Sequence, residues 1–346
     1  MWRGRRVLVT GGASFIGSHL VDALVERGAW VRIVDDLSSG TLDNVRHHLG
    51  GGSVEFIQAD LREPGVARAA MQGIDIVFHL AADHGGRGYV DTHQAGPASN
   101  LLLDGLVFWE ALKAGVEKVI FASSGCVYPN YLQTDPAQEV YLTEDAVGPP
   151  YDADNMYGWA KLMGERTLQA YHREYGLKAV SCRYFTVYGP RAKENHAVMA
   201  MIARAFIGQD PYEIWGTGEQ IRNWTYVSDI VEGTIRAAER IDDGTAVNLG
   251  TRERIRVLDA AKLICELLGH RPRFVTRPDM PTGPMNRVAD NTLAQRLLDW
   301  TPQVSFREGV RRTIEWYVQH RDRATVRRIL ESGGLVERKV VRDETQ

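Results

Sequence analysis

Two residues of this sequence, Tyr157 and Lys161, have the types and the spacing that acid–base chemistry needs. Residues four apart lie on the same face of a helix, one turn from each other. A lysine ammonium beside a phenol favours the phenolate, so we expect Lys161 to lower the pKa of Tyr157 toward the working pH. The pair therefore predicts a general base that takes a proton from a hydroxyl group while a hydride leaves the same carbon.

A second cluster of reactive side chains is the Ser-Ser-Gly-Cys turn at 123–126. It follows the apolar run 118–122, which predicts a buried strand, and ligands of open α/β sheets bind at the carboxyl ends of the strands. Ser124 is placed to hydrogen-bond the reacting hydroxyl or carbonyl oxygen. Cys126 has two interpretations, a reactive thiol or an inert core thiol, because cysteine is among the most buried residue types.

The start of the chain has the pattern of a dinucleotide-binding loop. A predicted strand at 5–10 leads through the Gly-rich turn 10–17 into a predicted helix at 15–27. Small residues let the backbone approach a pyrophosphate, and the helix N-terminus supplies unpaired N–H groups. Asp35 ends the second predicted strand, where a carboxylate binds the adenosine ribose and repels a 2′-phosphate, favouring NAD over NADP. The alternative is a glycine-rich turn beside a solvated Asp pair.

A parallel, doubly wound α/β sheet of the Rossmann type would bring these segments together, because predicted strands alternate with helical segments of about ten or more residues. The predicted strands are 5–10, 30–34, 53–59, 75–80, 118–122 and 178–184, and the predicted helices are 15–27, 93–114, 152–175, 198–207, 230–240 and 257–268. The expected domains are a Rossmann domain (1–187 plus about 225–250), a smaller C-terminal α/β substrate domain (188–224 and 251–330) and a loose tail (331–346).

The composition of the 346-residue chain argues against several classes of function. A formal net charge of −3 leaves no basic excess to neutralise a nucleic-acid backbone. No apolar run reaches the roughly 18–20 residues that span a bilayer, and the first residues lead into a strand rather than a signal core. Cys126, Cys182 and Cys265 lack metal-like spacing and predict reduced thiols without a metal site. We expect a cytoplasmic protein with neither nucleic-acid nor membrane partners.

Two further features are candidates for binding a phosphate-bearing small molecule. The segment 83–89 is rich in glycine, and Gly85 and Gly86 allow close backbone approach to a ligand, although a plain flexible loop has the same composition. Four arginines are candidates to bind a diphosphate, because the guanidinium fork pairs with phosphate oxygens. They are Arg222, Arg273, Arg277 and Arg287. Most surface arginines are solvated charges, which is the alternative for each of them.

With these motifs the chain resembles the extended short-chain dehydrogenase/reductase family over roughly residues 5–318. In that family a Thr-Gly-x-x-Gly-x-x-Gly loop binds NAD, a Ser or Thr and a Tyr-x-x-x-Lys pair carry out the chemistry, and a smaller C-terminal domain binds a nucleotide sugar. Ser14 stands where the family loop has its second glycine. The resemblance implies a homodimer formed through two long helices on one sheet face. The residues that it places at the cofactor are Gly11, Gly12, Ser14, Phe15, Ile16, Gly17, Asp35, Asp60, Leu61, Ala81, Tyr157 and Lys161.

Within that family, four stretches are most similar to the GDP-mannose 3,5-epimerases: 81–89, 123–129, 213–222 and 286–292. In those enzymes the Cys of the Ser-Ser-x-Cys turn and a Lys after a Tyr-Gly-Pro motif invert the carbons beside a transient 4-keto group. The implied catalytic residues are Ser124, Cys126, Tyr157, Lys161 and Lys193. The implied substrate-binding residues are Gly85, Gly86, Arg87, Ser124, Trp215, Arg222 and Arg287. Thr186 departs from the Asn that those enzymes have.

Three functions are compatible with these residues. The first is an NAD-dependent nucleotide-sugar epimerase that oxidises C4 transiently and inverts C3 and/or C5. The second is inversion at C4 alone, which needs only Ser124, Tyr157 and Lys161 and leaves Cys126 as a core residue. The third is a non-catalytic NAD-binding sensor or scaffold, which has no physical need for that trio. Dehydratases need an Asp-Glu pair where this chain has Gly125-Cys126, so elimination of water is not expected.

Overall fold

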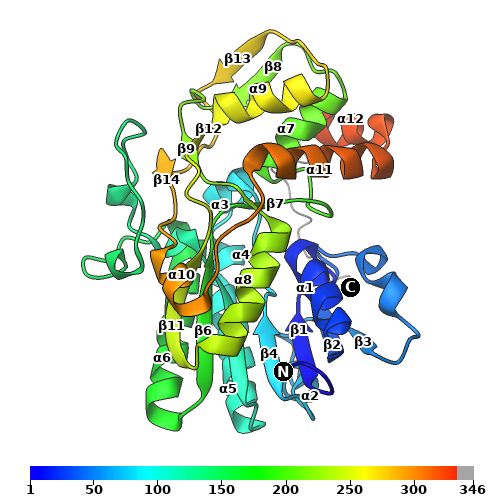
Figure 1. Cartoon of the computed structure of the whole chain (residues 1–346), viewed down its shortest axis with the longest axis vertical. Helices are drawn as coiled ribbons and strands as arrows, with labels where there is room; N and C mark the ends of the chain where they lie inside the picture. Colours follow the sequence, from blue (N-terminus) through cyan, green and yellow to red (C-terminus); the bar gives the residue numbers. More distant parts are fainter. Residues whose placement is uncertain (333–346) are drawn as a thin grey trace, which may run out of the picture.

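A seven-stranded parallel sheet forms the centre of the protein in the computed structural model, which describes residues 1–332 (Figure 1). In space the strands follow the order β3-β2-β1-β4-β5-β6-β11. They are β1 (Arg6–Thr10), β2 (Trp30–Asp35), β3 (Val54–Gln58), β4 (Ile76–His79), β5 (Lys118–Ser124), β6 (Lys178–Tyr184) and β11 (Asp243–Leu249). Val7 and Val9 of β1 enter the core on one face of the sheet, whereas Leu8 enters the core on the other. The predicted doubly wound parallel sheet is therefore confirmed.

Helices cover both faces of this sheet. One face carries α1 (Phe15–Glu26), α8 (Val227–Arg240) and α10 (Thr292–Leu298), and the other carries α2 (Val66–Ala70), α5 (Asn100–Lys113) and α6 (Asn155–Tyr175). Leu20 of α1, Ile230 of α8 and Ala294 of α10 share one buried apolar cluster. Val107 of α5 and Leu168 of α6 belong to the cluster on the opposite face. Because both faces are buried, the central strands are apolar throughout rather than alternating.

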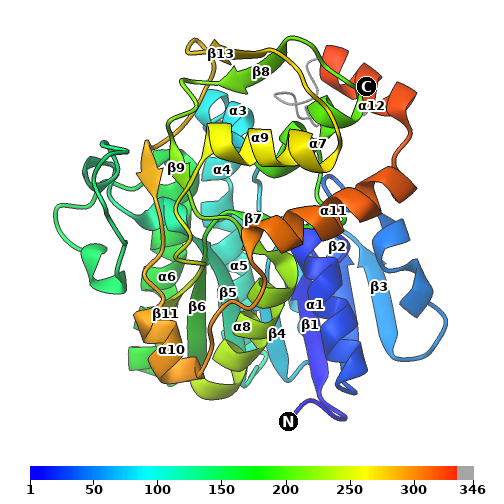
Figure 2. The ribbon, with the colours of Figure 1, turned by 45° about the horizontal axis from the view of Figure 1, so that its top comes forward.

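A smaller lobe lies beyond one end of the sheet (Figure 1, Figure 2). Its helices are α7 (Ala197–Phe206), α9 (Val257–Leu267), α11 (Phe306–His320) and α12 (Arg323–Glu331). Its strand pairs are β8 (Tyr212–Trp215) with β13 (Phe274–Arg277), and β9 (Ile221–Arg222) with β12 (Ile255–Arg256) and β14 (Asn286–Arg287). The lobe has its own apolar core, in which the rings of Trp224 and Phe306 stack with centroids 5.1 Å apart. The short paired strands β7 (Val187–Tyr188) and β10 (Thr225–Tyr226) connect it to the sheet.

Three helix predictions differ from the structure, and the first is the helix expected at 230–240, which begins at Val227. The single helix expected at 93–114 is wrong, because the chain forms α3 (Arg87–Thr92), α4 (Ala95–Ala98) and α5 instead. Pro97 has no backbone N–H and is accommodated only in the first turn of a helix, so α4 begins just before it. The helix expected from residue 152 begins at Asn155. Asn155 has a φ of 53°, which lies in the left-handed region, so a right-handed helix cannot continue through it toward residue 152.

The end of the chain is described only in part. The expected loose tail starts at residue 331, but Glu331 is still the last residue of α12, and residues 333–346 lie outside the described residues. Within residues 1–332, none of the helices is both long and apolar enough to cross a membrane. Cys126, Cys182 and Cys265 are free thiols.

The order of the strands reverses between β1 and β4, so the loops that follow these two strands run in opposite directions. In open α/β sheets this point is where ligands bind, outside the carboxyl ends of the strands. The two loops are in close contact, because a Cβ atom on Gly11 would lie 2.9 Å from the backbone N of Ala81. Gly11 also has a φ of 69°, which favours glycine.

Candidate active site

Tyr157 and Lys161 both lie on α6 and line a pocket at this end of the sheet. The Lys161 Nζ is 4.5 Å from the centroid of the Phe121 ring and 5.8 Å from that of the Tyr157 ring. The side chain is only 1 % exposed, and within residues 1–332 its Nζ has no hydrogen-bond partner. A buried ammonium with unsatisfied donors is costly, so this atom is suited to a ligand that brings acceptors.

The pKa of the Tyr157 phenol is raised, so the prediction that Lys161 lowers it is wrong for the structure as it stands. Burial is the largest cause of the raised pKa, and the negative charges of Cys126 and Asp104 add to it. A hydrogen bond with the Ser124 side chain acts in the opposite direction. Burial also lowers the pKa of Lys161, and the charge of Asp104 opposes that shift. A positive charge brought beside the phenol is therefore needed to make Tyr157 a base near neutral pH.

The turn that carries Ser124 and Cys126 packs against the first turn of α6. The Ser124 Oγ accepts a hydrogen bond from the backbone N of Cys126 at 3.1 Å, which caps the 3-10 helix η3 (Gly125–Val127). A Cβ atom on Gly158 would lie 2.3 Å from the carbonyl oxygen of Cys126, so only glycine permits this contact. The close packing brings the side chains of Ser124 and Tyr157 within hydrogen-bonding distance.

Cys126 is a partly exposed thiol of the pocket, which excludes the interpretation as a core thiol. The Arg287 Nη1 donates to its Sγ at 3.2 Å, and the Arg287 Nη2 pairs with Asp154 at 2.8 Å. Burial lowers the pKa of Arg287, but the charges of Cys126 and Asp154 outweigh it and leave the pKa raised. A guanidinium at this distance stabilises negative charge on the sulfur, which is the form that acts as a base.

Asp154 pairs with two arginines, and the charge of a third, Arg222, interacts with it at longer range. Besides Arg287, the Arg87 Nη2 pairs with its carboxylate at 2.8 Å. Arg222 donates to the carbonyl oxygen of Thr282 at 2.8 Å, and burial lowers its pKa to about 9, with the charges of Arg287 and Arg87 contributing. Arg87 also pairs with Asp91 at 3.0 Å. Three guanidinium groups against these two carboxylates leave one excess positive charge, which suits an anionic ligand.

The Gly-rich loop forms a cradle that a dinucleotide fits. A Cβ atom on Gly17 would lie 2.2 Å from the carbonyl oxygen of Gly11, so α1 packs directly on the loop. The N-terminal residues of α1 line the pocket, where free N–H groups and the helix dipole favour a pyrophosphate. This cradle and the unpaired Lys161 ammonium line the same pocket, so one ligand with a phosphate group and hydrogen-bond acceptors can contact both.

Asp35 is buried at the end of β2, so the alternative of a solvated Asp pair is wrong for this residue. Its Oδ2 accepts from the backbone N of Ala13 at 3.0 Å, and its Oδ1 accepts from that of Leu37 at 2.9 Å. Burial raises the pKa of Asp35, while these hydrogen bonds oppose the shift. The neighbouring Asp36 is exposed and accepts from Ser38.

The pocket gathers most of the predicted site residues. It is lined by Gly11, Ser14, Phe15, Ile16, Gly17, Asp35, Asp60, Leu61, Ala81, Gly85, Ser124, Cys126, Tyr157, Lys161, Lys193 and Arg287, but not by Gly12, Gly86, Arg87, Trp215 or Arg222. A Cβ atom on Gly12 would meet the Ile33 side chain at 2.9 Å, and one on Gly86 would lie 1.8 Å from the Asn195 carbonyl oxygen. At these two glycines the close approach is to the chain itself rather than to a ligand.

Several residues that we did not select from the sequence also line the pocket: Asp36, Ser38, Arg62, His84, Arg191 and His196. Arg62 could have been found, because it follows the end of the predicted strand 53–59 by three residues. In the structure it pairs with Asp60 at 2.6 Å. His196 had no such signal, since it comes from the smaller lobe. Burial lowers its pKa to about 4, with the charge of Lys193 contributing.

The chain is similar in sequence and in structure to enzymes that act on nucleotide sugars. The NAD dependent epimerase/dehydratase family matches residues 7–250. UDP-glucuronic acid decarboxylase 2 of Arabidopsis thaliana is 32% identical over 314 residues, covering 89% of this chain and 67% of the relative. GDP-mannose 3,5-epimerase 1 of Oryza sativa subsp. japonica is 30% identical over 321 residues, covering 90% and 81%. A Thermus thermophilus UDP-glucose 4-epimerase, solved in complex with NAD, superposes with a TM-score of 0.81 at 29% identity, covering 91% of this chain and 100% of that one.

The names of these relatives describe different reactions, namely a decarboxylation and two epimerisations. The sequence similarity extends well beyond the dinucleotide loop into the smaller lobe. The predicted cofactor, NAD, is that of the matched family. The chain belongs to the NAD dependent epimerase/dehydratase family.

Proposed function

We propose that the protein is an NAD-dependent epimerase of nucleotide-diphosphate sugars, which oxidises C4 of the sugar transiently and inverts C3 and/or C5. The observation that supports this most directly is the contact of the Cys126 Sγ with Arg287 in the pocket that also holds Ser124 and Tyr157. Inversion beside a ketone needs an acid/base group separate from the one that serves C4, and a thiol beside a guanidinium has that chemistry.

The first step is oxidation at C4. Tyr157 takes the proton of the C4 hydroxyl, Ser124 hydrogen-bonds the same oxygen, and Lys161 binds the ribose hydroxyls beside the nicotinamide. NAD, when bound, supplies reversible hydride acceptance from C4 and the positive charge that the buried phenol lacks. The product of this step is a 4-keto sugar.

The second step is inversion beside the ketone. The ketone acidifies the protons on C3 and C5, and Cys126 removes one of them while Arg287 balances its charge. Lys193, which also lines the pocket, returns a proton on the opposite face of the ring. Tyr157 then returns its proton to the C4 oxygen as hydride is restored to C4, which regenerates the alcohol.

In this proposal one region of the chain binds the cofactor and another binds the substrate. Residues 1–187 and about 225–250 bind the dinucleotide, and residues 188–224 and 251–330 bind the nucleotide diphosphate. The positive cluster of Arg87, Arg222 and Arg287 around Asp154 supports a diphosphate at the boundary between them.

One experiment separates this reaction from its competitors. The protein is incubated in D₂O with GDP-mannose, UDP-glucose and UDP-glucuronic acid, and NMR reads which carbons gain deuterium. Deuterium at C3 or C5 in a product that keeps all of its carbon atoms supports the proposal, because decarboxylation would also add a solvent deuteron at C5. A C4 epimer without deuterium identifies a 4-epimerase, because the hydride returns directly, and release of CO₂ identifies a decarboxylase. Binding of NAD without any product would leave a sensor or scaffold.

The wild-type protein should bind NAD at least about tenfold more tightly than NADP, equivalent to ~1.4 kcal/mol. The buried Asp35 carboxylate at the end of β2 would repel a 2′-phosphate. Asp35→Ala should narrow this preference, and Asp43→Ala, which removes an exposed carboxylate paired with Arg46, should leave it unchanged. Fluorescence titrations with NAD and NADP measure the preference in each protein. Equal affinities of the wild type for the two cofactors would contradict the role assigned to Asp35.

We also propose a homodimer that buries the outer faces of α5 and α6. These packed helices expose large apolar side chains, namely Leu101, Leu102, Trp109, Trp159 and Met163, each between 38 % and 55 % exposed. Leu102→Glu combined with Trp109→Glu should convert the dimer to a monomer in sedimentation velocity, because buried charges disrupt an apolar interface. Val318→Glu, on α11, should leave the dimer intact. A wild-type monomer at micromolar concentration would refute the proposal.

A further inference from the structure

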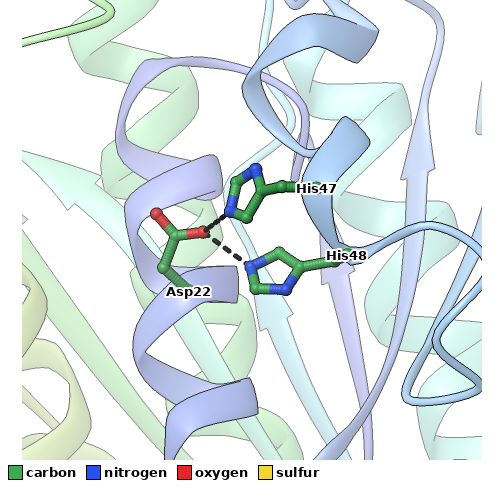
Figure 3. A group of neighbouring side chains, drawn as sticks. All are labelled: Asp22, His47 and His48. Carbon is green, nitrogen blue, oxygen red and sulfur yellow. Dashed lines mark hydrogen bonds and ion pairs between the residues drawn. The ribbon is translucent and has the colours of Figure 1, made fainter.

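Three side chains with metal-binding groups meet outside the pocket, where the 3-10 helix η2 (Arg46–His48) packs on α1 (Figure 3). The Nε2 atoms of His47 and His48 both contact the Oδ1 of Asp22, at 3.0 and 2.7 Å. The three ligand atoms lie within 4.8 Å of one another. Figure 3 shows both rings turned toward the same carboxylate oxygen.

We propose that Asp22, His47 and His48 bind one divalent transition-metal ion of the zinc type. Two imidazole nitrogens and one carboxylate oxygen are a ligand set that zinc accepts, with the fourth position left to water. Magnesium and calcium prefer oxygen ligands throughout, so this set discriminates against them.

The two distances from the Asp22 carboxylate to the histidine nitrogens are close to those around a bound ion. Bonds of about 2.0–2.2 Å in a tetrahedral arrangement separate the ligand atoms by about 3.3–3.5 Å. Each contact between Asp22 and a histidine therefore lengthens by less than about 1 Å when an ion enters. Half of the His47 side chain is exposed, so its ring can make this adjustment without moving the backbone.

The binding requires a change in where the ring protons sit. An Nε2 that donates to a carboxylate carries a proton, whereas a coordinating Nε2 must present its lone pair. In a neutral imidazole the proton then resides on Nδ1, and the ring stays uncharged. The ion replaces two N–H donors that now compete for one oxygen, so the site satisfies His47, His48 and Asp22 at once.

Arg191 occupies the other oxygen of the same carboxylate, with its Nη1 2.8 Å from the Asp22 Oδ2. Its charge weakens cation binding, but it also fixes the orientation of the carboxylate and leaves Oδ1 directed at the histidines. Carboxylates that bind metals commonly have such an outer partner. Arg191 also lines the pocket, so the proposed ion lies one side chain away from it.

The test titrates Zn²⁺ into the chelator-treated full chain by calorimetry, with Mg²⁺ for comparison and Co²⁺ for visible absorption. We expect one Zn²⁺ per chain at low micromolar concentration, no Mg²⁺ binding, and a Co²⁺ spectrum free of a thiolate band. His47→Ala, His48→Ala and Asp22→Asn should each weaken binding about 100-fold or more. His320→Ala is the control, because it removes an exposed histidine from α11, away from the three proposed ligands. It should leave the Zn²⁺ affinity unchanged.

A second readout guards against misfolding of a variant. Zn²⁺ should raise the melting temperature of the wild type but not that of His47→Ala, because a ligand stabilises the fold only where it binds. Unchanged affinity in the histidine variants, a thiolate band that points to Cys126, or wild-type binding only above about 100 μM would each overturn the proposal. In the last case the trio is a hydrogen-bonded tether between η2 and α1. None of these outcomes depends on which sugar the protein converts.

Discussion

Replacing Tyr157 by phenylalanine is expected to reduce turnover by about 10²–10⁴-fold, the usual loss when a positioned general base is removed. The ring keeps its packing, and the lost hydrogen bond with Ser124 costs only about 1 kcal/mol of the unfolding free energy. The rate of product formation and the appearance of NADH absorbance on addition of substrate measure the effect. Both should fall together, because oxidation at C4 precedes every later step.

Tyr175→Phe is the matched control for this change. It removes the same hydroxyl from the same helix, α6, at an exposed position away from the pocket. Turnover in this variant should equal that of the wild type, and NAD affinity should be similar in both variants. Near wild-type turnover in Tyr157→Phe would assign the base role to another group and remove the basis of the proposed mechanism.

Cys126→Ser is expected to abolish deuterium exchange at C3 and C5 while leaving hydride transfer at C4 intact. A hydroxyl is far less acidic than a thiol, with a reference thiol pKa of about 8.5, so serine cannot supply the base that Arg287 stabilises. The two steps are read separately, by NMR for the exchange and by absorbance for NADH. This variant therefore tests the second step without disturbing the first.

The control for that substitution is Cys265→Ser, which makes the same chemical change at a buried thiol of the smaller lobe. It should lower the melting temperature but leave the exchange at C3 and C5 unchanged. If the protein inverts C4 alone, Cys126→Ser should be nearly silent. Full exchange in that variant would leave Cys126 without a catalytic role.

The fold was readable from the sequence wherever hydrophobic periodicity was undisturbed. The run 118–122 gave the central strand β5, and Ile76–His79 formed β4 within the predicted bounds. The strand β11 was missed because it begins with Asp-Gly-Thr, residues typical of turns, and its pairing with β6 is irregular there. Around Pro97 the opposite error occurred. The hydrophobic pattern predicted one continuous helix, but proline lacks a backbone N–H, and the chain forms separate helices there.

The candidate site was readable to the extent that it depends on local spacing. Tyr157 and Lys161 follow from one helical turn, and Asp35 follows from the end of a strand. The environment of each group was not readable, because burial depends on the whole fold; the raised pKa of Tyr157 is the clearest case. Asp154, which pairs with Arg87 and Arg287 from distant segments, likewise has no sequence signal.

The contact between Gly86 and Asn195 sets how closely the two parts of the molecule approach. Gly86 follows β4 of the sheet, whereas Asn195 immediately precedes His196 and α7 of the smaller lobe. Even a methyl group at position 86 would overlap the Asn195 carbonyl oxygen, since its Cβ would lie 1.8 Å away. The segment that carries Lys193 and His196 would then be pushed outward. The width of the pocket therefore depends on glycine at position 86. Any other natural residue there would hold the two parts of the molecule further apart.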